Sequence, residues 1–304
     1  MSNLGTAILC LIAAGGVTQI VSGYHLQPAA AARPPVQGTT SNCTAAAEAP
    51  SVAAEAGFSK LVFCDDFDSL STIDVKTTGA PGFNWYTRQP FGRGRTPESD
   101  YSVANSVLSV TDNNNYNWGI ASMDPKTRSG NAWTFGYFEA RLSIDPDAAP
   151  NGPGWPAWWA DSAYHFCYES RDSPEPFAEL DFVEVPEARR TAFAGTLSEW
   201  ANGMTVHYRN SNNFPRVNVN WAQWHTVGVL WVRGRVTWYL DGRPVIVQEY
   251  SASSNPRPHS FSSSHSQEHA GLFAKLDSER LGELMILGSA SGWPLNVDWV
   301  RVWH

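Results

Sequence analysis

Hydrophobic residues alternate with polar ones over short runs of this chain, and Gly, Pro, Asn or Asp separates one run from the next. Successive side chains of a β-strand point to opposite faces, so this alternation predicts strands. The first predicted strand lies within Ser59–Asp68. The later ones are Ser102–Val110, Trp133–Ile144, Trp155–Ala160, Phe177–Val185, Met204–Tyr208, Trp224–Val232, Arg235–Leu240, Pro244–Glu249, Glu283–Leu287 and Asn296–Trp303. Many short strands at this spacing indicate an all-β sandwich or jelly roll.

Helical periodicity is nearly absent, and only His269–Leu281 is compatible with a short helix. Asp241-Gly242 stands between two predicted strands. Because Gly tolerates the positive φ that tight turns require, this dipeptide predicts a hairpin.

The run Phe177–Val185 differs from the other predicted strands because it places three carboxylates in an apolar segment. On a regular strand Glu179 and Asp181 share one face, whereas Glu184 falls on the opposite, apolar face. An ionised group buried there is costly unless it is paired. One extra residue at Phe182-Val183, a β-bulge, returns Glu184 to the face of Glu179. The sequence therefore predicts a bulge.

With the bulge, Glu179 and Glu184 flank Asp181 on one side of the strand, with their Cα atoms roughly 13 Å apart. Long side chains that lean inward bring the outer carboxyls to about 5–5.5 Å, the separation found in retaining glycosidases. One carboxylate then attacks the anomeric carbon while the other, protonated, supports the leaving oxygen. Asp181 can hydrogen-bond the nucleophile and help keep the acid protonated. A solvent-facing edge strand is the simpler alternative.

Composition and charge narrow the class of partner. The chain has 304 residues, of which 42% are hydrophobic and 16% charged, as in a soluble protein with one large β domain. A formal net charge of −8 argues against nucleic acid or an anionic membrane as partner. The 14 Trp residues suit the apolar faces of sugar rings, although core packing accounts for most of them. We expect a monomer that binds a neutral partner.

The N-terminal region is expected to be processed and only partly folded. Residues 1–23 contain an interrupted apolar stretch that is too short to span a bilayer but suits a signal peptide, with cleavage after Gly23 or within Ala29–Ala32. Residues 24–57 are rich in Ala, Pro, Ser and Thr and predict a flexible linker before a folded domain at 58–304. A secreted or periplasmic location follows.

Loss of Cys10 with the signal would leave Cys43, Cys64 and Cys167. At most one internal disulfide is then possible, and its partners cannot be read from the sequence.

Seven segments in order carry a resemblance to a known family. They are Leu61–Phe67, Phe135–Arg141, Gly154–Trp159, Glu179–Glu184, Trp224–Trp231 leading to Tyr239–Gly242, and Val297–Trp303. The chain resembles glycoside hydrolase family 16, concanavalin A-like jelly rolls that cut β-glucans and galactans. The resemblance implies a β-sandwich of two curved antiparallel sheets with a substrate cleft on the concave face.

The resemblance also implies roles for the three carboxylates. Glu179 falls at the position of the family's nucleophile, Asp181 at that of its helper and Glu184 at that of its acid/base. The six-residue form of this motif is similar to the branch with laminarinases, agarases and carrageenases, whose catalytic strand is bulged. No redox cofactor is implied.

Substrate contacts are expected from tryptophans. Trp155 and Trp159 share a strand face and Trp158 points the other way, so the first two are candidate sugar platforms, with core packing as the alternative. Trp293 resembles a cleft-rim position. The family's Gly-Thr-x-His segment is replaced by Gly195–Trp200, so that Ser198, Trp200 or His207 would take the role of its histidine.

The resemblance also bears on metal binding. Asp66 and Asp298 lie where many family members bind a structural calcium, although surface Asp is the commoner explanation.

The substrate follows less directly from the resemblance. An insertion, Asp161–Phe177, precedes the catalytic strand and is expected to reshape the cleft. A β-1,3- or mixed-linkage β-glucan is the leading substrate, and a galactan or bacterial exopolysaccharide, a transglycosylase and a non-catalytic carbohydrate-binding sandwich are the alternatives.

Overall fold

The structure, a computed structural model, describes most of the chain after residue 47. The described residues are 43, 48–111, 119–144, 154–168, 177–185, 191, 193–201, 204–208, 217–250, 277, 281–290 and 293–304. Only the backbone is described at 168, 198–201, 204–208 and 289–290. The predicted signal peptide and nearly all of the possible helix His269–Leu281 lie outside the described residues.

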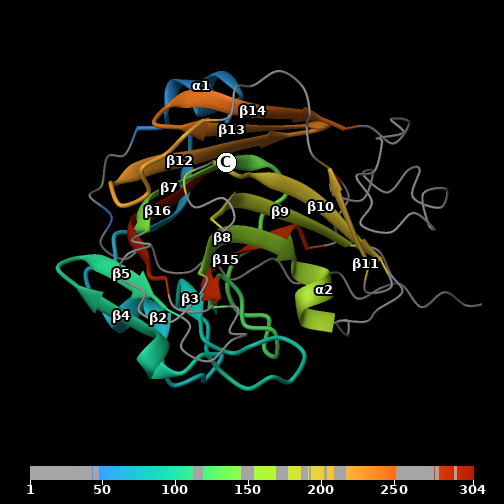
Figure 1. Cartoon of the computed structure of the whole chain (residues 1–304). Helices are drawn as coiled ribbons and strands as arrows, with labels where there is room; N and C mark the ends of the chain where they lie inside the picture. The colour runs from blue at the N-terminus through green and yellow to red at the C-terminus, as the bar shows by residue number, and fades with distance from the viewer. Residues whose placement is uncertain are drawn as a thin grey trace, which may run out of the picture. The chain divides into compact units, whose positions relative to one another are not determined.

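The described strands form two sheets that lie as layers, one above the other in Figure 1. The first has the order β14 (Arg243–Glu249), β13 (Arg235–Leu240), β12 (His225–Val232), β7 (Gly136–Ile144), β16 (Leu295–Trp303), β5 (Val107–Val110) and β4 (Tyr101–Ala104), with β1 (Leu61–Asp65) also paired to β16. The second has the order β11 (Met204–Tyr208), β10 (Thr196–Ala201), β9 (Phe177–Glu184), β8 (Trp155–Ser162), β15 (Glu283–Ala290), β6 (Ile120–Ala121), β3 (Trp85–Tyr86) and β2 (Ile73–Asp74).

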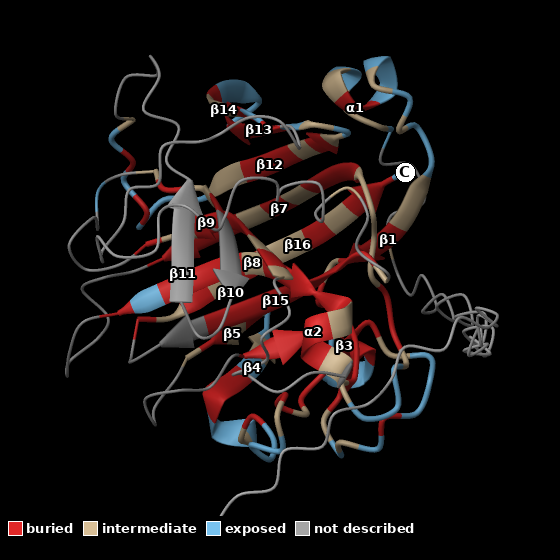
Figure 2. Ribbon diagram, turned by 90° about the vertical axis from the view of Figure 1, so that its right-hand side faces the viewer, coloured by how far each residue is buried: buried red, intermediate tan, exposed pale blue. Residues whose placement is uncertain are grey.

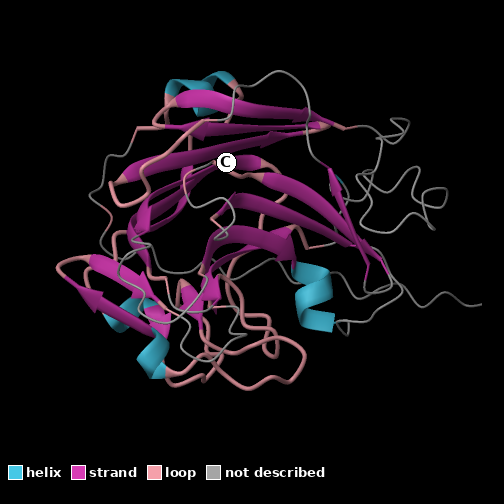
Figure 3. Cartoon of the chain, in the orientation of Figure 1, coloured by secondary structure: helices cyan, strands magenta, loops and turns pink. Residues whose placement is uncertain are grey.

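Helices are few in the part of the chain that the structure describes, as Figure 3 shows. They are α1 (Ser51–Glu55), α2 (Ala163–Tyr168) and the 3-10 turns η1 (Leu70–Thr72) and η2 (Glu98–Asp100). None of the described helices is long and apolar enough to cross a membrane. Apart from the short parallel pair of β2 with β3, the sheet pairings are antiparallel. The predicted all-β sandwich is confirmed.

The main hydrophobic core lies between the two sheets. Along β7, buried residues alternate with half-buried Glu139 and Arg141, and Figure 2 shows this as alternating bands on β7, β12 and β16. The Phe182 ring stacks on Phe138 of the opposite sheet at 5.1 Å, and it meets Trp158 of the adjacent strand β8 edge-on at 4.5 Å between centroids. This aromatic packing holds the Phe182 side chain in the core. The core therefore determines which residues of β9 point inward and which point outward.

Ordered structure begins earlier than the expected domain start at residue 58. Ala53 of α1 is buried in a cluster with Tyr137, Tyr239 and Trp303. The sequence favours a linker here because its residues are small, but a small residue suits a helix that sits close against aromatic rings. The segment 48–57 therefore belongs to the folded unit.

Two local expectations can be compared with the structure. Asp241 and Gly242 have φ of 50° and 74° between β13 and β14, so the predicted hairpin turn is confirmed. Cys43 and Cys64 form a disulfide, with Cα atoms 6.2 Å apart, and Cys167 is a free thiol. The disulfide joins the chain before α1 to strand β1.

Candidate active site

The predicted bulge is present in β9. Against β8, Trp159 pairs with Asp181 and Trp158 pairs with Val183, which leaves Phe182 as the extra residue. Glu184 then pairs with Ala157. Since Ala157 and Trp159 lie on the same face of β8, the bulge turns Glu184 to the face that carries Asp181.

The neighbouring strand on the other side shows the same irregularity. Thr196 of β10 pairs with Asp181, while the backbone N–H of Glu184 donates to the carbonyl of Ala194 at 2.9 Å. Three steps along β9 thus match two steps along the adjoining segment. Trp238 of the opposite sheet donates its indole N–H to the carbonyl of Asp181 at 2.8 Å, which anchors the bulge from the core side.

Glu179, Asp181 and Glu184 are the predicted catalytic residues, and we call this set the catalytic row. Asp181 is only 2% exposed, whereas the two glutamates are half-buried. The indole N–H of Trp155 donates to Oε1 of Glu184 at 2.8 Å. A ligand can therefore reach the two glutamates at the ends of the row, whereas Asp181 between them is buried.

Burial and mutual repulsion keep protons in this row. Burial raises the pKa of Asp181 well above its ordinary value, and the charges of Glu184 and Glu179 raise it further. Burial also raises the pKa of Glu184, against hydrogen bonds from Trp155 and Asp181 that lower it. Asp181 and Glu184 together therefore retain a proton at pH values where an exposed carboxyl has lost it. The sequence had suggested a hydrogen bond from Asp181 to Glu179.

Trp155 and Trp159 lie on the face of the row, and Trp158 is buried in the main core, as predicted. Trp155 is 49% exposed beside Glu184. Trp159 is half-buried because it packs against a smaller apolar cluster that includes Phe166 of α2. Trp155 is thus the indole that presents most area to a ligand.

Comparison with known proteins identifies the family. The model described as glycosyl hydrolases family 16 matches residues 96–280, more than half of the chain, and this span includes all of β9. The chain belongs to glycosyl hydrolase family 16. Its members are described as glycosyl hydrolases, enzymes that cleave glycosidic bonds.

Individual relatives are distant. The endo-1,3-1,4-beta-glycanase ExsH of Rhizobium meliloti (strain 1021) is 29% identical over 168 residues, which cover 52% of this chain and 32% of the relative. The chain therefore spans about a third of the length of that curated relative. A laminarinase structure from Flavobacterium sp. UMI-01 is 14% identical, with a TM-score of 0.50, over 81% of this chain and 100% of that one. LamAcat from Zobellia galactanivorans has a TM-score of 0.49 at 14% identity, over 82% and 99% of the two chains. The Flavobacterium structure shows the shared jelly-roll fold.

Two other residues that the sequence predicts to contact substrate are Trp293 and Trp200. Trp293 is 3% exposed in the main core, and a Cβ at Gly154 would meet its ring at 2.0 Å. The expectation of a cleft-rim position is thus wrong, because the indole fills the space left by the missing side chain of Gly154. The side chain of Trp200 lies outside the described residues; its backbone pairs with Phe177.

The expected calcium site is not assembled by the two aspartates. Asp66 pairs with Arg301 at 3.1 Å, and Asp298 pairs with Arg141. Each carboxylate thus has a guanidinium of its own, which replaces the charge that a cation would supply. Among the described residues, no group of three or more His, Cys, Asp or Glu side chains could hold a metal ion.

The structure adds two residues near the row that the sequence had not singled out. Asp161 of β8 is the cross-strand partner of Glu179, and His165 of α2 lies against it. Both fall in the insertion Asp161–Phe177, Asp161 near the end of β8 and His165 in α2. Nothing in the sequence links either residue to Glu179, because the strand register and α2 bring them together.

Proposed function

We propose that this family 16 chain is a retaining, endo-acting β-glucan hydrolase. The observation that supports it is the bulge at Phe182, which gathers Glu179, Asp181 and Glu184 on one face of one strand. A carbohydrate-binding sandwich needs no such row, because burying a carboxyl as deeply as that of Asp181 lowers the stability of the fold.

The reaction divides into two steps. The ionised carboxylate of Glu179 attacks the anomeric carbon, and Glu184 gives its proton to the oxygen of the leaving sugar as the glycosidic bond breaks. Glu184, now ionised, then takes a proton from water, whose oxygen displaces Glu179 and restores the free enzyme. Asp181 serves as a proton partner of Glu184 during this exchange, since the two carboxyls share a hydrogen bond.

The proposed substrate is a β-1,3- or mixed β-1,3-1,4-linked glucan. The name of the Rhizobium meliloti relative supports it. The exposed indole of Trp155 offers an apolar platform at the Glu184 end of the row, which suits the flat face of a neutral sugar.

We also propose that the enzyme acts outside the cytoplasm. The Cys43–Cys64 disulfide supports this, because such bonds persist mainly in oxidising compartments. The predicted signal peptide at residues 1–23 would direct the export.

The test compares wild type, Glu179→Gln and Glu139→Gln on a panel of β-glucans, a galactan and a bacterial exopolysaccharide. Glu139 is a matched control because it is a half-buried strand glutamate of the other sheet, where it accepts a hydrogen bond from Tyr137 at 2.9 Å. Glu179→Gln is expected to lose reducing-end release by roughly 10⁴-fold or more, with Glu139→Gln close to wild type.

Proton NMR of the first products settles the stereochemistry, since a retaining enzyme releases the β-anomer first. Initial release of the α-anomer, or full activity in Glu179→Gln, would refute the mechanism. Turnover of the galactan or exopolysaccharide alone would refute the substrate and leave the mechanism standing.

A further inference from the structure

Asp161 is the residue nearest to the proposed nucleophile on the adjacent strand. It pairs directly with Glu179 and faces the same side of the sheet as Trp159 and the catalytic row. Directly opposed residues of an antiparallel pair have Cβ atoms about 4.5–5.5 Å apart. Carboxylates carried by such opposed residues repel each other when both are ionised. The protonation state of Asp161 therefore affects that of Glu179.

His165 is the group that lies against the Asp161 carboxyl. Its Nδ1 is 3.4 Å from Oδ2 of Asp161, and the two side chains are 4% and 1% exposed. The imidazole stacks face to face on Phe177, with centroids 3.4 Å apart and planes 8° apart. Phe91 lies 5.2 Å from the same ring. Because Phe177 shares its strand face with Glu179, His165 contacts the nucleophile's strand directly and its cross-strand neighbour as well.

Two polar atoms of this pair have no hydrogen-bond partner among the described residues. They are Oδ1 of Asp161 and Nε2 of His165, both fully buried. A buried polar atom left unpaired costs about 1–3 kcal/mol. Such atoms in a folded protein call for a reason in function or in a bound group.

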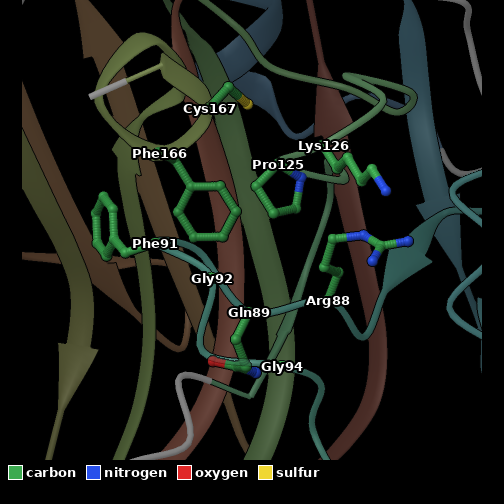
Figure 4. A pocket seen from close by; sticks show the side chains of 9 residues that line it. All are labelled: Arg88, Gln89, Phe91, Gly92, Gly94, Pro125, Lys126, Phe166 and Cys167. Atoms are coloured by element: carbon green, nitrogen blue, oxygen red, sulfur yellow. The ribbon is translucent and has the colours of Figure 1, made fainter. Parts of the chain in front are cut away.

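The cavity next to α2 does not supply that reason. It has a volume of about 430 Å³ and is lined by Arg88, Phe91, Lys126, Phe166 and Cys167, among others, as Figure 4 shows. Neither Asp161 nor His165 is among its lining residues. The pair is therefore separated from this cavity and adjoins the catalytic row.

We propose that Asp161 and His165 are a positioning pair for the catalytic row, in which the imidazole holds the Asp161 carboxyl against Glu179 and so fixes the orientation and charge state of the nucleophile. The effect of the pair on catalysis rests on the proposed function. Its effect on the pKa values of the row can be measured without any substrate.

Several charged or titratable groups of the described residues lie around the pair. They are Glu179 and Asp181 of β9 and Cys167 of α2. Asp124 and Arg128, in the turn after β6, act in turn on Cys167. On β15, Leu284 lies opposite Asp161, and Glu283 pairs with Ser162 beside it. Burial raises the pKa of Asp161, and His165 lowers it. His165 thus favours the ionised form of Asp161 against the effect of burial, and a charge on Asp161 raises the pKa of Asp181.

The first arm of the test uses carbon-13 NMR of the side-chain carboxyls and needs no substrate. Asp161→Asn is expected to lower the apparent pKa of Asp181, because the substitution removes a charge that raises it. His165→Phe, which keeps a ring on Phe177 but removes Nδ1, is expected to raise the pKa of Asp161. Glu139→Gln on the other sheet serves as the control. An unchanged titration of the row in Asp161→Asn would overturn the proposal.

The second arm measures kcat and KM on whichever polysaccharide of the panel the wild type hydrolyses. His165→Phe is expected to lower kcat by roughly 100-fold, the effect of a small misplacement of a reacting group, with little change in KM. His165→Asn, whose amide nitrogen can replace Nδ1, is expected to recover most of the loss. Equal activity of His165→Phe and wild type would show that the ring serves only for packing. If the wild type hydrolyses nothing on the panel, the proposed function fails, and the NMR arm still decides the electrostatic role of the pair.

Discussion

Replacing Trp155 by Phe tests how the protonation of the proposed acid is tuned. The substitution keeps an aromatic ring beside the row and removes the N–H that donates to Oε1 of Glu184 at 2.8 Å. This hydrogen bond lowers the pKa of Glu184, so its loss raises that pKa. If the pKa of Glu184 rises, the free enzyme keeps this proton to higher pH. The basic limb of the pH profile of kcat/KM is therefore expected to move to higher pH.

The size of the shift follows from the exposure of the donor. A hydrogen bond to a charged group contributes about 1.5–3 kcal/mol. Trp155 is 49% exposed, so water competes for the same carboxylate oxygen, and we reduce the contribution to about 0.5–1 kcal/mol. At about 1.4 kcal/mol per pKa unit, the limb is expected to move by roughly half a unit.

The measurement is kcat/KM over the pH range of activity, on a soluble β-glucan, for wild type, Trp155→Phe and Trp224→Phe. Trp224 is the control because it is also an exposed indole but directly precedes β12 of the other sheet, with Arg141 of β7 stacked over its ring at 4.9 Å. An increase in KM in Trp155→Phe without a shift of the limb would mean that the indole binds sugar but does not tune Glu184. A downward shift would refute the assignment of Glu184 as the acid.

Two further predictions concern stability. Phe182→Ala is expected to lower the free energy of unfolding by about 3–5 kcal/mol in urea titrations, because it opens a cavity between Phe138 and Trp158, whereas Leu70→Ala on the surface should change it by less than about 0.5 kcal/mol. A loss below about 1 kcal/mol for Phe182→Ala would contradict the packing of the bulge. For Asp181, the raised folded pKa means that its contribution is complete below the unfolded pKa of about 3.9 and is lost as pH rises toward the folded value. Asp181→Asn is therefore expected to match wild type near pH 3.5 and to exceed its stability by up to about 1.4 kcal/mol per pH unit above 4. A gap that does not vary with pH would contradict this.

Much of the site was predictable because β-strand geometry is simple. A period of two assigns every residue of Phe177–Val185 to a face, and one charge in the wrong phase is enough to predict an extra residue. The same parity placed Trp155 and Trp159 opposite Trp158. In each case the information needed was contained in one strand.

The predictions that differed from the structure depended on partners far away in the chain. Trp293 is buried because Gly154, distant in sequence, leaves room for its ring. The candidate calcium ligands Asp66 and Asp298 form ion pairs with Arg301 and Arg141. Nothing in the sequence around either aspartate predicts these pairs. The sequence suggested that residues before 58 form a linker, since their composition does not reveal the aromatic surface that receives Ala53.

The sequence by itself determined the fold class, the bulged strand and the three acids that the strand carries, because alternation and charge are local properties of a strand. Only the tertiary structure decided which groups surround those acids: the indole at Glu184, the proton shared with Asp181, and the Asp161–His165 pair behind Glu179. The physical reason is that a carboxyl's proton affinity depends on burial and on charges within a few ångströms. Those neighbours are brought together by sheet register and by α2, not by spacing along the chain.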